Sequence, residues 1–150
     1  MKLHKDLREF IGLLNSHGVD YLIVGGHAVA FHGYPRFTGD TDFFVRPTAK
    51  NAERLMRVLG AFGFGDIGLD IGTFTLPDKV VQLGRPPNRI DLLTSISGVG
   101  FEAGWDSRVA AELDGLPVWF IGREALLQNK RAAGRIKDAD DIEKLTSRKR

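Results

Sequence analysis

Hydrophobic residues recur with the period of a helix near the start of the chain and again after the first third. The first amphipathic face is formed by Leu3, Leu7, Phe10, Ile11 and Leu14. Gly18 follows it and suits the left-handed backbone that ends a helix. The second face, formed by Ala52, Leu55, Met56 and Leu59, predicts a helix that opens at Pro47 and Thr48 and ends before Gly63.

Short apolar runs between and beyond these helices predict strands. The runs are residues 21–24, 41–45, 80–83, 89–94, 109–113 and 117–121. Asp114-Gly115 joins the last two as a hairpin turn. Further helices are expected at 27–32, at 123–133 and, after a break at Gly134, at 138–145. This order predicts an α/β (α+β) fold with a mixed β-sheet flanked by helices, while the glycine-rich residues 65–76 receive no assignment.

The composition fits one domain that spans residues 1–150 and ends in helices from about residue 123. With 150 residues, 43% of them hydrophobic, the chain is long enough to bury a core. The absence of cysteine excludes disulfides and thiolate ligands, so any metal must bind oxygen or histidine. The charged N-terminus and the lack of a run of about 18 apolar residues favour a cytoplasmic protein with no membrane partner.

Basic residues are concentrated at the C-terminal end. From residue 130 to residue 150 there are eight Lys or Arg against four Asp or Glu, although the net charge of the chain is only +2. Such a segment suits a polyphosphate or nucleic-acid partner. A solvated helix face has the same composition, and we favour that interpretation for Arg148, Lys149 and Arg150.

Two aspartates stand at the front of the strand in GDTDFFVRP. Residues i and i+2 of a strand share one face, so Asp40 and Asp42 are expected side by side. Their repulsion raises the pKa of one of them unless a cation intervenes, and a divalent metal ion would relieve it. The alternative is that Asp40 caps a turn after Gly39 while Asp42 pairs with Arg36 or Arg46.

Two further features of the sequence indicate a binding site: a third acid on another strand and a pair of glycines before a helix. In NRIDLLT, Asp91 interrupts another apolar strand and is expected on the face opposite Ile90 and Leu92. In IVGGHAVAF, a strand ends at Gly25-Gly26 and runs into a helix, which leaves backbone N–H groups free to bind an anion. The alternative for the glycine pair is a tight turn without a ligand.

These residues together resemble the nucleotidyltransferase superfamily typified by DNA polymerase beta. Gly25-Gly26, Asp40-Thr41-Asp42 and Asp91 follow the order of its glycine turn, paired acids and third acid. The segments GGHAVAFHGYPRFTGDTDFFV, QLGRPPNRIDLLT and LLQNKRAAGRIKDADDIEKL resemble small bacterial members related to AbiEii-type toxins and minimal nucleotidyltransferases. The resemblance extends from roughly residue 20 to residue 145.

The resemblance implies a metal-dependent reaction that moves a nucleoside monophosphate from a nucleoside triphosphate to an acceptor hydroxyl, with pyrophosphate leaving. Asp40 and Asp42 would hold Mg²⁺ or Mn²⁺, and Asp91 would complete the metal site near the attacking hydroxyl. Gly25 and Gly26 would contact the triphosphate. Two metals that stabilise the entering and leaving oxygens are compatible with such a displacement.

The roles of several other residues stay open at the level of sequence. The resemblance makes Lys130, and after it Arg36, candidates for phosphate contacts, although Lys130 is equally compatible with a surface lysine. His27 follows the glycine pair and suits phosphate contact, capping or packing. Asp138 and Asp141 are interpreted as an N-cap and a solvated acid in the first turn of a helix.

The acceptor is not specified by the sequence. It is expected to be an RNA end, a protein side chain or a small molecule, and a partner protein or a homodimer is expected to complete the site of so short a chain. The resemblance suggests a role in a toxin–antitoxin system. The alternatives are a non-catalytic nucleotide-binding or partner-binding module of the same fold, and a nucleic-acid-binding protein that uses the basic tail.

Overall fold

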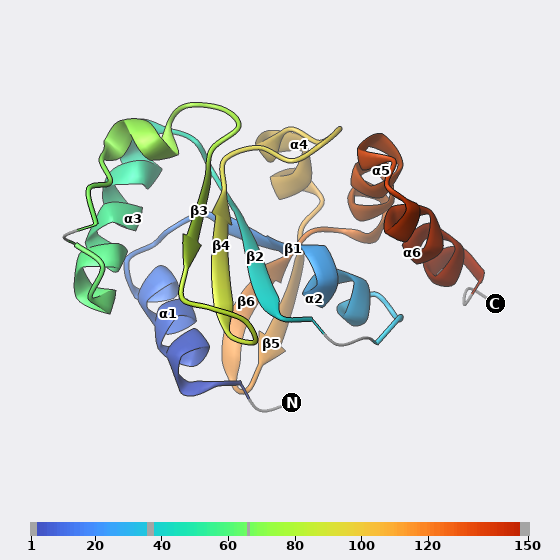
Figure 1. Cartoon of the computed structure of the whole chain (residues 1–150), viewed down its shortest axis with the longest axis horizontal. Coiled ribbons are helices and arrows are strands. Elements are labelled where there is room, and N and C mark those ends of the chain that lie inside the picture. The colour runs from blue at the N-terminus through green and yellow to red at the C-terminus, as the bar shows by residue number, and fades with distance from the viewer. Residues whose placement is uncertain (1–2, 36–37, 66, 148–150) are drawn as a thin grey trace.

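The computed structural model describes residues 3–35, 38–65 and 67–147. Over these ranges the chain forms one six-stranded sheet with helices on both faces (Figure 1). The strands are β1 (Tyr21–Val24), β2 (Asp40–Val45), β3 (Val80–Leu83), β4 (Arg89–Leu93), β5 (Val109–Leu113) and β6 (Leu116–Phe120). The helices are α1 (Lys5–Ser16), α2 (Gly25–Phe31), α3 (Ala49–Phe62), the 3-10 helix η1 (Ile71–Phe74), α4 (Phe101–Asp106), α5 (Arg123–Ala133) and α6 (Ile136–Ser147).

The sheet is mixed, as the sequence predicts. Its strand order is β3-β4-β2-β1-β6-β5. β2 runs parallel to β4 and antiparallel to β1, β1 runs parallel to β6, and the antiparallel strands β3 and β5 form the two edges. The two strands that carry the acidic motifs are therefore neighbours near the middle of the sheet, although about fifty residues separate them in sequence.

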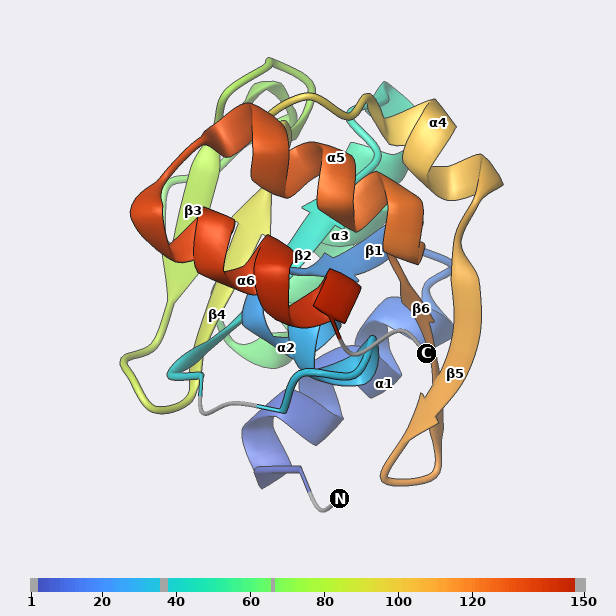
Figure 2. The same ribbon diagram turned by 90° about the vertical axis from the view of Figure 1, so that its right-hand side faces the viewer.

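The helices form a layer on each face of the sheet. Alternation along β2 turns Phe43 and Phe44 to opposite faces. The ring of Phe43 packs 5.5 Å from that of Phe10 in α1, and the ring of Phe44 packs 5.1 Å from that of Phe101 in α4. α1 and α3 cover the first face, while α2, α4, α5 and α6 lie over the second, where α5 and α6 stand in front of the sheet in Figure 2.

Local signals account for several helix ends. Thr48 caps α3 by accepting a hydrogen bond from the N–H of Asn51, and Gly63 ends that helix with a φ of 98°. Gly134 ends α5 with a φ of 66°. α2 begins at Gly25, two residues earlier than predicted, and the sequence did not predict η1 or α4.

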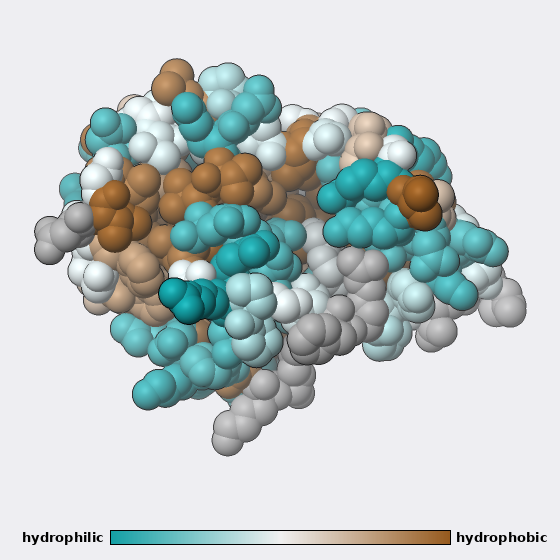
Figure 3. Space-filling view, viewed as in Figure 1, coloured by the Kyte–Doolittle hydropathy of each residue, from teal (hydrophilic) through white to brown (hydrophobic). Residues whose placement is uncertain are grey.

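The surface carries some exposed apolar side chains. They include Ile67, Ile71, Leu76 and Val80, in and around η1 and β3. Figure 3 shows hydrophobic residues gathered on this side of the molecule, where β3 forms the edge of the sheet. Among the described residues, no helix has both the length and the apolar character needed to cross a bilayer.

Candidate functional site

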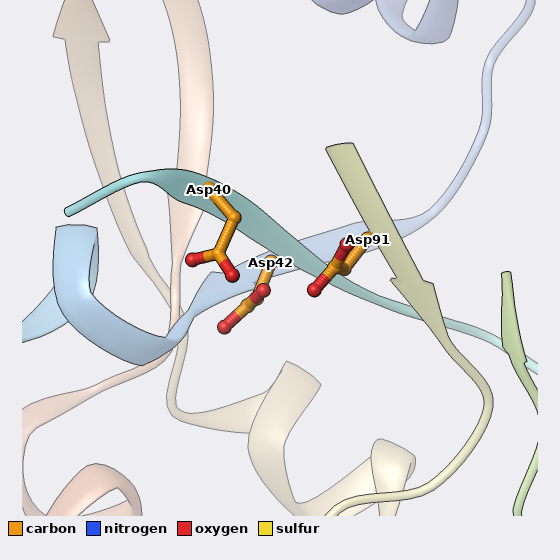
Figure 4. A group of neighbouring side chains, drawn as sticks. All are labelled: Asp40, Asp42 and Asp91. Atoms are coloured by element: carbon orange, nitrogen blue, oxygen red, sulfur yellow. The ribbon is translucent and has the colours of Figure 1, made fainter. Parts of the chain in front are cut away.

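Three carboxylates gather on one face of the sheet. Parallel pairing sets Asp42 of β2 directly beside Asp91 of β4, and Asp40 lies two residues earlier on the same face of β2. One ligand oxygen from each of the three aspartates lies within 4.8 Å of the other two (Figure 4). The structure therefore brings together the three acids that the sequence placed on two separate strands.

Two of the three carboxylates, those of Asp42 and Asp91, open onto a cavity of about 540 Å³. Asp42, Asp91 and Gly25 line it on the side of the sheet, and Lys130 and Arg135 line it on the side of α5 and α6. Acidic and basic side chains thus face the same space from opposite walls. A cavity of this size, into which several polar and charged groups converge, is a candidate small-molecule site.

Arg89 is the main neighbour of these acids that sequence reasoning missed. Its guanidinium donates hydrogen bonds to Oδ2 of Asp40 at 2.6 Å, and to Oδ1 and Oδ2 of Asp91 at 2.8 and 3.0 Å. The sequence contained a signal for this contact, because Arg89 lies two residues before Asp91 and therefore on the same strand face. Its pairing with Asp40 follows from the β2–β4 register.

The alternative in which Asp42 pairs with Arg46 is wrong. Arg46 binds the carboxylates of Asp20 and Glu102 instead. The reason is that Arg46 follows the end of β2, away from the acids at its start. Arg36 lies outside the described residues.

Burial and excess negative charge together determine the electrostatics of the site. Burial, followed by the repulsion of Asp40 and Asp91 and a hydrogen bond shared with Asp91, raises the pKa of Asp42 from 3.8 to about 7, while Arg89 opposes the shift. The donor set consists of carboxylate oxygens alone, which suits hard divalent ions such as Mg²⁺ and Mn²⁺. The residues present therefore fit a divalent cation.

Gly25 is required by the position of Asp42. A Cβ atom on Gly25 would lie 2.2 Å from Oδ2 of Asp42, and Gly25 has a φ of 69°. Gly26 lies against Thr38 instead, where a Cβ would meet the side chain at 3.0 Å. The glycine pair thus lets the start of α2 approach the acids, which is a structural reason for a motif that the sequence linked to phosphate.

Lys130 is buried, so its interpretation as a surface lysine is wrong. Its side chain is 4% exposed, and Nζ lies 3.3 Å from Asp138 and 3.1 Å from Asp141. It nevertheless lines the cavity. An ammonium group has three N–H donors, so these two ion pairs do not exhaust its capacity to bind an anion.

The interpretation of Asp138 as an N-cap and of Asp141 as a solvated acid is also wrong. Both residues are 0% exposed. Asp138 is the third residue of α6, and it accepts hydrogen bonds from the backbone N–H and the guanidinium of Arg135. The physical reason is that α6 packs back onto α5, which turns this side of the helix towards Lys130 instead of towards water.

The two histidines near the glycine pair differ in their surroundings. Burial lowers the pKa of His27, against the opposing influence of Asp40, and so favours the neutral ring. Nε2 of His32 lies 2.7 Å from the carbonyl oxygen of Ile121. His32 therefore ties α2 to the segment after β6.

Comparison with known proteins places the fold. No protein-family model and no curated protein matches the sequence. A crystal structure of a predicted nucleotidyltransferase from Thermotoga maritima is similar, with a TM-score of 0.59 and 14% identity over 95% of this chain and 91% of that one. An antigenic nucleotidyltransferase-like protein from Paracoccidioides brasiliensis matches with a TM-score of 0.55 and 20% identity over 95% of this chain and 73% of that one. The chain therefore has the nucleotidyltransferase-like fold.

Proposed function

We propose that this protein is a metal-dependent nucleotidyltransferase that moves a nucleoside monophosphate from a nucleoside triphosphate to an acceptor hydroxyl. The observation that carries the proposal is the group of Asp40, Asp42 and Asp91, whose ligand oxygens converge beside a cavity of about 540 Å³. The fold of the chain supports it, since similar structures carry the name nucleotidyltransferase.

Asp40, Asp42 and Asp91 would hold Mg²⁺ or Mn²⁺. When bound, such an ion neutralises the carboxylates and stabilises charge on the oxygens of the displacement at phosphorus. The raised pKa of Asp42 supports this role, because it reflects burial and, after burial, negative charge that Arg89 alone does not compensate. Gly25 keeps the start of α2 close enough to Asp42 to enclose the site.

The chain's own residues supply binding and proton transfer. The oxygen of the acceptor hydroxyl forms a bond to the α-phosphorus, the bond to pyrophosphate breaks, and the hydroxyl proton passes to a carboxylate oxygen of Asp91. Lys130 would contact the phosphates from the wall of the cavity that faces the acids. Gly25, Gly26 and Arg36 remain proposed phosphate contacts.

The resemblance to AbiEii-type toxins and minimal nucleotidyltransferases also supports a proposal for the biological role and the acceptor. It supports a cytoplasmic single-domain enzyme in a toxin–antitoxin system, with an RNA end, a protein side chain or a small molecule as acceptor. A partner protein or a second copy of the chain would complete the acceptor side of the site.

The alternative is a non-catalytic nucleotide-binding or partner-binding module of the same fold. Arg89 is the observation that favours this alternative, because its guanidinium partly neutralises Asp40 and Asp91 without a metal. The two functions differ in what becomes of the bound nucleotide. Only the enzyme releases pyrophosphate and labels an acceptor.

The test is the variant Asp40→Asn/Asp42→Asn. Calorimetric titration with ATP, GTP, CTP and UTP, with and without Mg²⁺, should show metal-dependent binding that the variant loses. Transfer of label from α-phosphate-labelled nucleotide to RNA, protein or small-molecule fractions should fall by roughly a thousandfold or more, because the metal ion contributes several kcal/mol to the transition state.

The matched control is Asp106→Asn/Asp140→Asn, which also removes two carboxylates but from exposed helix positions. It should bind and transfer as the wild type does. Transfer that persists unchanged in Asp40→Asn/Asp42→Asn would reject the assignment. Metal-dependent binding without any transfer or pyrophosphate release would favour the non-catalytic module.

A further inference from the structure

Arg89 occupies a place in the acid cluster where a metal ion would be expected to bind. Three of its hydrogen bonds end on oxygens of Asp40 and Asp91, at 2.6, 2.8 and 3.0 Å. Both oxygens of Asp91 are engaged, so the guanidinium faces this carboxylate with two parallel N–H groups. This fork geometry is the strongest arrangement available between an arginine and a carboxylate.

The charge of Arg89 is permanent. A guanidinium does not lose its proton in proteins, so this positive charge stays with the cluster at every physiological pH. It is also supplied by the same strand as Asp91, which makes its local concentration independent of the solution. The acids are therefore never without a cation, whether or not a divalent ion is present.

Arg89 and a divalent ion need the same oxygens. A Mg²⁺ or Mn²⁺ ion must approach carboxylate oxygens closely, and Oδ2 of Asp40 and both oxygens of Asp91 already accept N–H groups. A guanidinium within this cluster also repels an incoming dication. The arginine side chain is 25% exposed, so it has a route towards solvent that the buried acid Asp91 lacks.

We propose that Arg89 is a built-in counter-ion that competes with the divalent cation for Asp40 and Asp91. In the metal-free protein the guanidinium holds the two carboxylates together. When the metal binds, the guanidinium leaves the shared oxygens. This competition sets how much metal is needed to load the site, and the inference rests on the metal site of the proposed function.

The competing role and a merely structural role predict opposite results. If Arg89 only aligned the carboxylates for the metal, its removal would loosen the site and weaken metal binding. If Arg89 competes, its removal leaves three unshielded carboxylates and strengthens metal binding. In both cases the metal-free protein becomes less stable, so metal affinity is the measurement that decides.

The experiment titrates Mn²⁺ alone into wild type, Arg89→Ala and Arg89→Lys by calorimetry, with melting temperatures recorded with and without the metal. We expect Arg89→Ala to bind Mn²⁺ about tenfold more tightly, because one positive charge beside a dication is removed. Arg89→Lys keeps the charge without the fork and should fall between the two. Arg57→Ala, an exposed arginine on α3 across the sheet, is the matched control and should not change Mn²⁺ binding.

The melting temperature without metal should fall in Arg89→Ala and recover when Mn²⁺ is added, by more than the wild type gains. Equal or weaker Mn²⁺ binding by Arg89→Ala would overturn the inference. Should that variant fail to fold, Arg89→Lys decides in the same way, because tighter binding supports the inference and equal or weaker binding rejects it.

The outcomes separate this inference from the proposed function. Metal-dependent transfer by the wild type, together with unchanged Mn²⁺ affinity in Arg89→Ala, rejects the inference and leaves the function intact. Tighter Mn²⁺ binding in Arg89→Ala, together with no nucleotide transfer by the wild type, supports the inference and rejects the enzyme. No Mn²⁺ binding by any of these proteins overturns both the inference and the metal site.

Discussion

Two clusters of acidic and basic side chains face the same cavity, and they differ in charge balance. On the sheet, the guanidinium of Arg89 binds Asp40 and Asp91, and Asp42 lies beside Asp91. On the helices, the carboxylates of Asp138 and Asp141 meet the cations Lys130 and Arg135. The first cluster has an excess of acid, whereas the second has equal numbers of acids and bases.

The pKa values of the two clusters shift in opposite directions. Burial and neighbouring acids raise the pKa of Asp42 to about 7. Burial by itself would also raise the pKa of Asp138, but hydrogen bonds from Arg135 and Lys130 lower it overall. A balanced buried cluster satisfies its own charges and joins α5 to α6. An unbalanced cluster at a cavity needs a further cation, which is the feature expected of a site.

The largest effect is expected from a variant that disrupts the balanced cluster of Lys130, Arg135, Asp138 and Asp141. Lys130→Met removes the cation that Asp138 and Asp141 share and leaves buried carboxylates without it. We expect the free energy of unfolding to fall by about 3–5 kcal/mol, since a buried charge that loses its partner is strongly destabilising. Chemical denaturation at neutral pH measures the change.

The control for this variant is Lys137→Met, which removes an exposed lysine from α6. It should change the free energy of unfolding by less than about 0.5 kcal/mol. A loss below about 1 kcal/mol in Lys130→Met would mean that water or another side chain compensates the acids. The contrast drawn between the two clusters would then be wrong.

The next effect concerns the contact between Gly25 and Asp42. Gly25→Ala places a Cβ only 2.2 Å from Oδ2 of Asp42, too close for both atoms to keep their places. The residue also has a φ of 69°. Gly115→Ala is the matched variant, with a φ of 81° and no atom within 4 Å of the new Cβ. Both should lose about 1 kcal/mol of stability from the left-handed backbone.

Only Gly25→Ala should also lose metal affinity, because the carboxylate of Asp42 must rotate away from the new methyl group. We expect about a tenfold weaker Mn²⁺ affinity, comparable to the loss of a residue that orients a ligand. Calorimetry on both variants measures it. Equal Mn²⁺ affinity in the two variants would show that Asp42 has room to keep its place, or that it is not a ligand.

A further expected effect is the pH dependence of the metal-free protein. The pKa of Asp42 is higher in the folded state than its ordinary value of 3.8, so the folded protein binds more protons between that value and about 7. The free energy of unfolding should therefore fall as the pH rises through this window. Asp42→Asn should flatten this dependence, as unfolding in urea at several pH values would show.

The opposite slope is expected for the balanced cluster. Because the pKa of Asp138 is lowered in the folded state, its contribution to stability is present above the ordinary value of 3.8 and is lost at more acidic pH.

Mg²⁺ should stabilise the protein more at pH 8 than at pH 5, because it binds the deprotonated form of Asp42. A stabilisation by Mg²⁺ that does not depend on pH would remove Asp42 from the metal site.

Much of the fold was predictable, because short-range patterns determine it. The six strands and the long helices α1, α3 and α5 follow from periodicity, and the end of α3 follows from Thr48 and Gly63. α4 and η1 escaped prediction because each is short and has no clear period in a segment rich in glycine. Their positions depend on packing against the sheet, as Phe101 shows by its contact with Phe44.

By itself, the sequence determined which strands carry Asp40, Asp42 and Asp91 and which face of each strand they occupy, since strand alternation is a local rule. Only the tertiary structure decided that β2 and β4 are neighbours in register, which brings Asp91 beside Asp42 and Arg89 beside Asp40. The packing of α6 onto α5 likewise buried Asp138 and Asp141. Pairing and burial depend on contacts between residues far apart in the chain, and a pattern read along one sequence does not contain them.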